Sequence, residues 1–173
     1  MNKIITLLLL GMSLLACNFL FPQRRPSTPA PSDFQDPQPT GFTIVRLQPN
    51  DGDLQNMLSN EAKKAVSLGQ LPVVEFDATW CPPCQAIDKA MKDKNELILN
   101  AYSGTYIIRL DVDEWGWGNS GLHDFEFDGI PVFFKLDSAG YQTGEVIDGG
   151  AWEDDIPENI APVMDKFFHG PLK

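Results

Sequence analysis

Residues 73–84 read VVEFDATWCPPC, and this stretch decides how the rest of the chain is interpreted. Its first half, Val73 to Ala78, is a compact apolar run typical of a buried β-strand, and it carries the acid Glu75. Its second half places Cys81 and Cys84 where a helix should begin. Two intervening residues on a first helical turn bring two sulfurs close enough to join. Prolines are tolerated there, because first-turn N–H groups have no intrahelical partner.

A cysteine at the start of a helix is expected to be reactive, because unpaired N–H groups and a partial positive charge favour thiolate over thiol. Gln85 follows Cys84 where a c-type haem attachment motif would need a histidine, so that motif is excluded. A zinc site would need His123 and His169, at spacings unlike any compact zinc module. A copper site that uses both thiolates stays open as an alternative.

Composition limits the chain to one domain of ordinary size plus accessory segments, since it has 173 residues of which 43% are apolar. Thirteen Lys and Arg against 24 Asp and Glu give a net charge of −11, which argues against nucleic acid and against adhesion to anionic lipid. The cysteines, Cys17, Cys81 and Cys84, are too few for a disulfide framework or a four-cysteine zinc site. We expect neither a metal nor a cofactor.

Hydrophobic periodicity predicts alternating strands and helices. A helix capped by Asp53 should end at Gly69, and a second should run from the cysteine pair to about Ala101. A hairpin turn is expected at 137–140, and a closing helix at 154–168 with a possible kink at Pro162. Strands are predicted at 42–47, 72–78, 105–112, 132–136 and 144–148. This order indicates a layered α/β domain.

Residues 41 to about 169 resemble the thioredoxin family. Besides the stretch quoted above, the resemblance rests on IIRLDVDE at 107–114 and GIPVFFKLDSAGYQTGEVIDGG at 129–150. It implies a thioredoxin-like α/β fold over residues 41–173, with a central mixed β-sheet flanked by helices. It also implies the activity of a thiol–disulfide oxidoreductase.

The resemblance implies a role for each residue around the pair. Cys81 would be the exposed nucleophile and Cys84 the buried resolving thiol. Ile130-Pro131 would form a cis peptide packed beside the pair and offer backbone groups to an extended substrate segment. The substrate-binding residues would then be Trp80, Pro82, Pro83, Ile130 and Pro131.

Glu75 lies six residues before Cys81, where members of that family commonly carry a buried acid. Burial would raise its pKa, so the carboxylate could take the proton of Cys84 as that thiol attacks a mixed disulfide. We expect this carboxylate to lack a full partner; the alternative is an acid that faces water. Arg109 falls where relatives often have a lysine, but a guanidinium cannot give up its proton, which argues against a relay there.

Trp115 and Trp117 lie in the loop after the third predicted strand, and two interpretations stay open: they contact a partner, or they pack over the sheet. The acids from Asp113 onward are expected to form mostly a solvated face, with partner discrimination by charge as a lesser role. The resemblance also bears on the redox poise: strong oxidants of this fold often have a histidine between the cysteines, so prolines at both positions favour reduction or an intermediate poise.

The N-terminus has the form of a secretory signal. Ile4 to Leu15 is an apolar run of twelve residues, which as a helix rises about 18 Å, short of a ~30 Å hydrocarbon core. Leu14-Leu15-Ala16-Cys17 resembles the lipobox of bacterial lipoproteins, which implies removal of residues 1–16 and acylation of Cys17. The alternative is a plain signal peptide with a chance cysteine.

Residues 17–40 are predicted to form a semi-extended tether, because six prolines fall between Asn18 and Thr40 (22, 26, 29, 31, 37 and 39). Asn18 is not the aspartate that resembles an inner-membrane retention signal. This favours the periplasmic face of the outer membrane in a bacterial cell envelope.

The sequence therefore predicts a lipid-anchored monomer that reduces or exchanges disulfides of envelope proteins and contributes to cell redox homeostasis. Its partners would be protein disulfides or dithiols, an unidentified electron donor and a membrane, but no nucleic acid. The alternative from another class is a copper-binding or docking module that uses the same cysteine pair without redox turnover.

Overall fold

The computed structural model describes residues 41–118 and 124–170, all within one compact unit of the chain, Gln35–Lys173. The predicted signal, Cys17, the tether and His123 lie outside the described residues. In the described ranges, no helix is long and apolar enough to cross a membrane.

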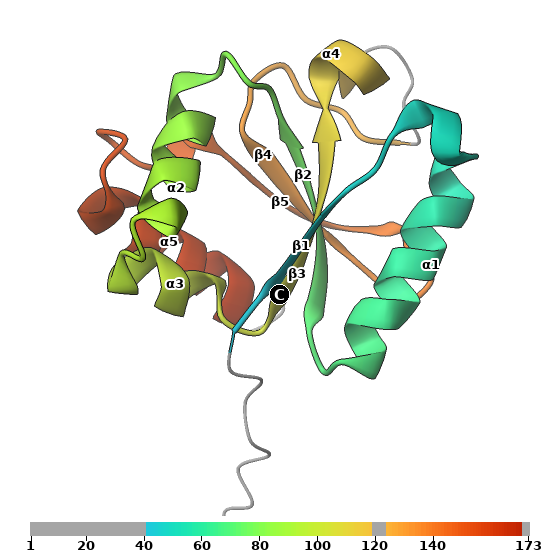
Figure 1. Ribbon diagram of the computed structural model, residues 1–173, viewed down its shortest axis with the longest axis horizontal. Helices are drawn as coiled ribbons and strands as arrows, with labels where there is room; N and C mark the ends of the chain where they lie inside the picture. Colours follow the sequence, from blue (N-terminus) through green and yellow to red (C-terminus); the bar gives the residue numbers. More distant parts are fainter. Residues whose placement is uncertain (1–40, 119–123, 171–173) are drawn as a thin grey trace, which may run out of the picture. The chain divides into compact units, whose positions relative to one another are not determined.

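A mixed β-sheet forms the centre of the described domain (Figure 1). Its strands are β1 (Thr43–Arg46), β2 (Leu71–Asp77), β3 (Thr105–Asp111), β4 (Val132–Leu136) and β5 (Gln142–Asp148). Their order is β1-β3-β2-β4-β5; β3 pairs in parallel with β1 and β2, whereas β4 runs antiparallel to β2 and β5. This arrangement confirms the expected thioredoxin-like α/β fold.

Helices cover both faces of the sheet (Figure 1). The α-helices are α1 (Leu54–Ser67), α2 (Pro82–Lys92), α3 (Glu96–Tyr102), α4 (Val112–Trp115) and α5 (Pro157–His169). Two 3-10 turns, η1 (Pro49–Asp51) and η3 (Gly149–Ala151), lie beside them. One face of the sheet carries α1, and the other carries α2, α3 and α5.

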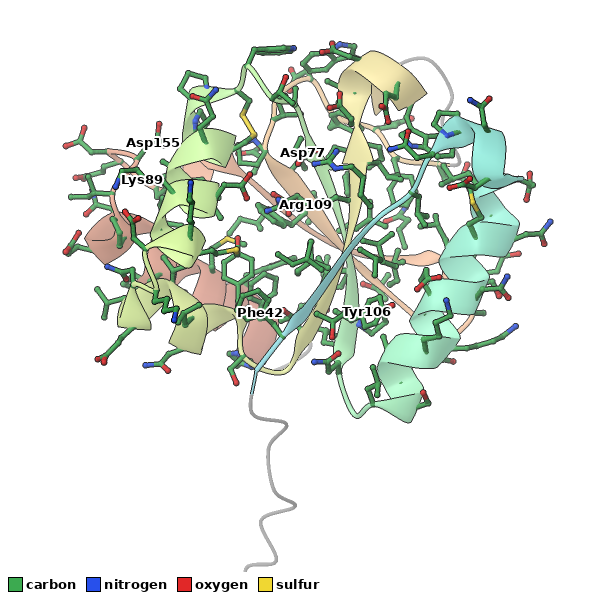
Figure 2. All side chains as sticks on the ribbon, viewed as in Figure 1. Phe42, Asp77, Lys89, Tyr106, Arg109 and Asp155 are labelled. Carbon is green, nitrogen blue, oxygen red and sulfur yellow. A yellow bond between two sulfur atoms is a disulfide. The ribbon has the colours of Figure 1, made fainter. Side chains whose placement is uncertain are left out.

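Side-chain alternation along the strands separates two hydrophobic clusters. Val74 and Phe76 of β2 pack with α1, whereas Val73 packs with α2, α3 and α5. Figure 2 labels one ring on each face, Tyr106 toward α1 and Phe42 toward α3. Because β2 is buried on both sides, every residue from Pro72 to Asp77 is buried. Full burial of a side chain the size of Phe76 stabilises the fold by about 1.5–3 kcal/mol.

The helix predicted from the cysteine pair to Ala101 is in fact two helices, α2 and α3. The chain breaks at Lys94, whose φ is 58°, a left-handed conformation that interrupts a helix. Asn95 then caps α3, since its side-chain oxygen accepts hydrogen bonds from the N–H groups of Leu97 (3.1 Å) and Ile98 (3.3 Å). The Asn–Glu pair at 95–96 is the sequence signal of this second start.

The closing helix begins at Pro157 rather than at Asp154, because proline with its fixed φ suits the first helical position. The hairpin turn at 137–140 is confirmed. Gly140 is required there: its φ is +85°, and a Cβ would lie 2.5 Å from the backbone nitrogen of Ser59 in α1.

Candidate active site

Cys81 and Cys84 form a disulfide at the start of α2, with their Cα atoms 5.3 Å apart. Cys81 is the N-cap residue, and its Sγ accepts a hydrogen bond from the N–H of Cys84 at 3.2 Å. This N–H and the positive end of the α2 dipole favour a negative charge on the Cys81 sulfur when the pair is reduced. The predicted pairing of the two sulfurs is therefore confirmed.

The expectation that Cys81 is exposed is wrong for the disulfide form. Cys81 is 1% exposed and Cys84 4%, so both sulfurs are buried. The cap position turns Cys81 toward the end of the sheet, where it packs in the hydrophobic cluster with Ala78 and Val112. Exposure in the disulfide form therefore does not distinguish Cys81 from Cys84. Their positions at the helix terminus do, because only Cys81 is the N-cap residue.

The peptide bond between Ile130 and Pro131 is cis, as expected. Its loop lies beside the pair, because the Ile130 carbonyl oxygen is 3.7 Å from the Sγ of Cys81. The other side of the loop is fixed by the N–H of Gly149, which donates to the Pro131 carbonyl at 2.9 Å. Ile130 is half-buried and Pro131 is buried. The loop thus presents backbone rather than the proline ring.

Trp80, Pro82 and Pro83 surround the pair on its outer side. Trp80 is 53% exposed, Pro82 is exposed and Pro83 is half-buried. The indole N–H of Trp80 donates to the carboxylate of Asp113 at 2.8 Å, which fixes the orientation of the ring. These residues form the accessible surface at this end of the sheet.

Trp115 and Trp117 pack over the sheet, so the second of the two interpretations is confirmed for their packing. Both are half-buried against the hydrophobic cluster on the α1 face. The indole N–H of Trp115 donates to the Leu47 carbonyl at 3.1 Å. The ring of Trp117 lies 6.1 Å from that of Phe127 and 6.4 Å from that of Trp80, so it also supports the exposed ring beside the disulfide.

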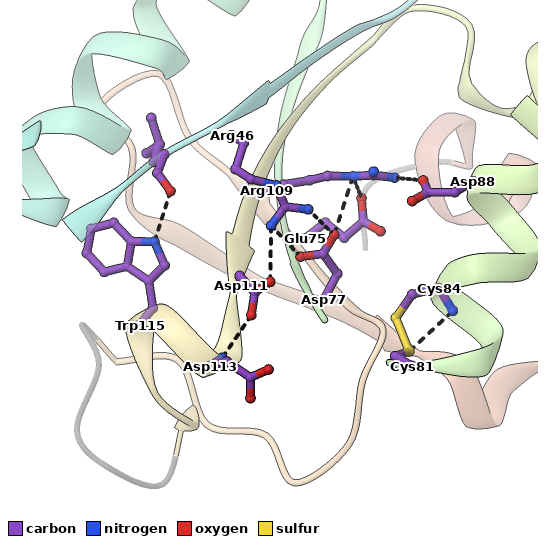
Figure 3. A network of polar contacts seen from close by, with 11 residues as sticks. Arg46, Glu75, Asp77, Cys81, Cys84, Asp88, Arg109, Asp111, Asp113 and Trp115 are labelled. Carbon is purple, nitrogen blue, oxygen red and sulfur yellow. Dashed lines mark hydrogen bonds and ion pairs between the residues drawn. A yellow bond between two sulfur atoms is a disulfide. The ribbon is translucent and has the colours of Figure 1, made fainter. Parts of the chain in front are cut away.

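Glu75 is fully buried on the face of β2 that α2 covers, so the alternative of a water-facing acid is wrong. The expectation that it lacks a full partner is wrong for Oε2 but holds for Oε1 among the described residues. The guanidinium of Arg109, on the neighbouring strand β3, donates through Nε to Glu75 Oε2 at 2.7 Å. The Nη2 of Arg109 reaches the carboxylate of Asp88 on α2 at 2.7 Å. Arg109 therefore ties the sheet to the helix that carries the cysteines (Figure 3).

Burial raises the pKa of Glu75 to about 7, because the cost of burying a charge exceeds the opposing attraction of Arg109. The nearby Asp77 adds to the rise. The second oxygen of Glu75, Oε1, is buried and has no hydrogen-bond partner among the described residues. A carboxyl with such a pKa can both accept and release a proton near neutrality.

A second arginine and two more acids continue this polar cluster, and the sequence analysis missed them. Arg46 binds both carboxylate oxygens of Asp77, at 2.9 and 2.5 Å, and lies 3.8 Å from Asp111. Asp111 in turn accepts the N–H of Asp113 at 2.9 Å. Figure 2 shows Asp77 and Arg109 close together on the sheet. The available signal was the placing of charged residues at alternate positions inside two apolar strands, 75 and 77, and 109 and 111.

The described residues offer no cluster of three or more metal ligands near the cysteine pair. Within residues 41–118 and 124–170, no group of three or more His, Cys, Asp and Glu side chains is arranged to hold a metal ion.

Comparison with known proteins agrees with this geometry. The profile of the thioredoxin family matches residues 54–162, which is more than half of the chain. The chain belongs to the thioredoxin family. Like other members it is a thiol–disulfide oxidoreductase, and its Cys81–Cys84 disulfide has the spacing of a redox-active pair.

The matched region covers a different share of each relative. Thioredoxin-1 of Schizosaccharomyces pombe is 37% identical over 92 residues, which are 52% of this chain and 76% of the yeast protein. The thiol:disulfide interchange protein TxlA homolog of Synechocystis is 34% identical over 96 residues, 52% of this chain and 51% of that protein. The solved thioredoxin of Trichomonas vaginalis is 26% identical, with 61% of this chain and 84% of that chain covered and a TM-score of 0.40.

In this thioredoxin-family protein the two cysteines should differ in reactivity once reduced. We expect Cys81 to be alkylated first, because it alone accepts the N–H at the helix start and so ionises more readily. Peptide mapping after brief, substoichiometric alkylation measures the label on each cysteine. Equal labelling of Cys81 and Cys84 would contradict the helix-terminus argument.

Proposed function

We propose that this protein is a membrane-anchored, extracytoplasmic thiol–disulfide oxidoreductase that reduces or exchanges disulfides of envelope proteins through Cys81 and Cys84. The observation that carries the chemistry is the hydrogen bond from the Cys84 N–H to the Cys81 Sγ, beside the Ile130 carbonyl. It supports the assignment of Cys81 as the sulfur stabilised as a thiolate, beside the loop where we propose that a substrate segment binds.

The reaction consists of two exchanges. The Cys81 thiolate attacks one sulfur of the substrate disulfide; that S–S bond breaks, a mixed disulfide forms and one substrate thiolate leaves. The Cys84 thiolate then attacks the Cys81 sulfur and releases the second substrate thiolate. The substrate gains two electrons, and the enzyme is left as the Cys81–Cys84 disulfide, which an electron donor must reduce before the next turnover.

Glu75 serves the second exchange in this proposal. Only a thiolate attacks, and Cys84 lies in an apolar cluster that raises the cost of ionising it. Glu75 lies on the strand that leads to the pair, on the face covered by α2, and its Oε1 has no partner among the described residues. We propose that this carboxylate accepts the proton that Cys84 releases when it attacks.

Substrate contact is assigned to Trp80, Pro82, Pro83 and the Ile130-Pro131 loop. Trp80 and Pro82 are the exposed members of this set. The Ile130 carbonyl, adjacent to Cys81, is placed to accept a backbone N–H from an extended segment of a substrate.

The activity is tested by reacting the reduced protein with an uncharged peptide disulfide and following the release of peptide thiol. Wild type should release two thiols per peptide and end as the Cys81–Cys84 disulfide, whereas Cys81→Ser should release none. Metal content of the purified reduced protein provides a second readout. Stoichiometric copper without thiol release would contradict the proposal and support the metal-binding alternative.

The anchored location rests on the sequence alone, namely the apolar run that ends in Leu14-Leu15-Ala16-Cys17. We expect the mature chain to begin at Cys17 and to carry two or three acyl chains, which give stable anchoring where one chain is marginal. Intact-mass analysis of membrane-extracted protein measures the added mass. A soluble species cleaved at another position would contradict the anchor but leave the exchange chemistry untouched.

A further inference from the structure

Four segments surround the disulfide at one end of the sheet, and all of their charge is negative. The segments are 78–82, 112–118, 124–131 and 148–151, which meet through contacts described above: Trp80 with Asp113, Cys81 with Ile130, and Pro131 with Gly149. Figure 1 shows the β2–α2 turn, α4 and the segment before β4 at this common end. They contain no Lys or Arg and six exposed acids: Asp113, Glu114, Asp124, Glu126, Asp128 and Asp148.

Four of these six acidic side chains form no described contact that stabilises the fold. Asp113 holds the Trp80 indole, and Asp148 accepts the N–H of Gly150 at 2.8 Å. The remaining four make no hydrogen bond or ion pair with any described residue: Glu114, Asp124, Glu126 and Asp128. Their charge is therefore available to a molecule that approaches the disulfide.

Cations elsewhere in the described domain do not neutralise this surface. Arg46 and Arg109 are held by the buried acids of the sheet, and Lys89 is paired with Asp93. Other lysines lie near the C-terminal ends of α1, α2 and α5, and these helix ends are away from the β2–α2 turn (Figure 1). These are Lys63, Lys64, Lys92, Lys94 and Lys166, whereas Lys135 of β4 is buried and paired with Glu145. None of these cations therefore lies in the four segments that border the disulfide.

The apolar part of the same surface is suited to the same partner. Trp80 is 53% exposed, is held by Asp113, and lies 6.4 Å from the Trp117 ring. Trp80 directly precedes Cys81 in the chain, so its exposed ring is available to a segment bound at the pair. A Lys or Arg side chain can lie over an indole face while its charge meets the surrounding carboxylates.

We propose that this surface selects substrate polypeptides that carry Lys or Arg beside the cysteine under attack. The inference rests on the proposed exchange activity and names its substrate class. Attraction of opposite charges raises the association rate by about 10 to 10³-fold at low salt. It should vanish at high salt, because the Debye length falls from about 10 Å at 0.1 M to about 3 Å at 1 M.

Three peptide disulfides of equal length, with Lys, Ser or Glu flanking the reactive cysteine, test the inference. Each rate with the reduced wild-type protein is divided by the rate of the same peptide with dithiothreitol, which removes the intrinsic reactivity of the peptide. We expect the Lys peptide to react at least about tenfold faster than the Glu peptide at low salt. The two rates should converge in 1 M NaCl.

Matched charge variants locate the effect. Glu114→Gln with Asp128→Asn removes two exposed charges from the segments that border the disulfide, and Glu96→Gln with Asp165→Asn removes two exposed charges on α3 and α5. The first pair should lower the Lys-to-Glu rate ratio by about threefold or more. The second pair should leave that ratio unchanged.

The outcomes separate this inference from the proposed function. Equal rates for the Lys and Glu peptides, or an equal fall of the ratio in both variant pairs, would overturn the substrate class while the exchange activity stands. Failure of the Ser peptide to react would instead overturn the exchange activity itself.

Discussion

Replacing Glu75 by Gln should slow the attack of Cys84 on the mixed disulfide by about 10²- to 10⁴-fold, the usual effect of losing a general base. The first attack by Cys81 should keep its rate, because the helix terminus and not Glu75 stabilises that thiolate. Stopped-flow measurement of both exchanges separates the two steps. Glu61→Gln, on α1 at the opposite face of the sheet, is the matched control and should change neither rate.

The effect of Glu75→Gln should also depend on pH. With a pKa of about 7, Glu75 is an effective base at and above neutrality, and at high pH Cys84 ionises without help. The ratio of wild-type to Glu75→Gln rates should therefore shrink as the pH rises well above 8. A ratio near one at every pH would remove Glu75 from the mechanism.

The free energy of unfolding should also depend on the protonation of Glu75, and it should fall as the pH rises. The pKa of Glu75 is about 7 in the folded protein against its ordinary value of 4.5, so the folded state holds an extra proton between these values. The free energy of unfolding, relative to Glu75→Gln, should fall by about 3 kcal/mol as the pH rises from 4.5 to 7, at about 1.36 kcal/mol per unit. Denaturant unfolding of both proteins across this range measures the difference.

Replacing Arg109 by Met should destabilise the fold by about 3–5 kcal/mol at pH 8, because a buried carboxylate then loses its ionic partner. The Arg109 side chain is 9% exposed and binds Glu75 and Asp88 at 2.7 Å each, so its loss also removes the ion pair that joins α2 to the sheet. The loss should be smaller at pH 5, where Glu75 is protonated. Urea unfolding at both pH values gives the two free energies.

Two further variants control for this effect. Lys64→Met removes an ion pair whose lysine is 61% exposed, and should cost no more than about 1 kcal/mol. Glu75→Gln combined with Arg109→Met should recover part of the stability at pH 8, since no buried charge is then left alone at that position. A double variant as unstable as Arg109→Met would show that the guanidinium acts by packing rather than by pairing.

Much of the fold follows from local patterns in the sequence. Short apolar and β-branched runs located each strand of the sheet, and the cysteine spacing after a buried strand located the start of α2. The cis peptide at Ile130-Pro131 was expected only from the family resemblance, because a cis X–Pro bond depends on tertiary contacts. The break at Lys94 was missed because helical periodicity continues on both sides of it.

The candidate site was harder to predict because its polar contacts cross between strands. Glu75 and Arg109 are 34 positions apart, and only the parallel register of β2 and β3 makes them opposite neighbours. The burial of Cys81 likewise depends on the loop at Ile130, 49 positions later. Such contacts come from the assembled sheet, whereas the position of the cysteine pair at the start of a helix is local and was correctly predicted.

The most direct test of the account is to trap the first exchange with Cys84→Ser. Reduced Cys84→Ser protein is mixed with an uncharged peptide disulfide, and the covalent product is digested and mapped by mass spectrometry. The account predicts a stable mixed disulfide between the peptide and Cys81, which dithiothreitol reduces. The matching Cys81→Ser protein should form none. A product on Cys84 in Cys81→Ser but none on Cys81 in Cys84→Ser, or no covalent product in either, would contradict it.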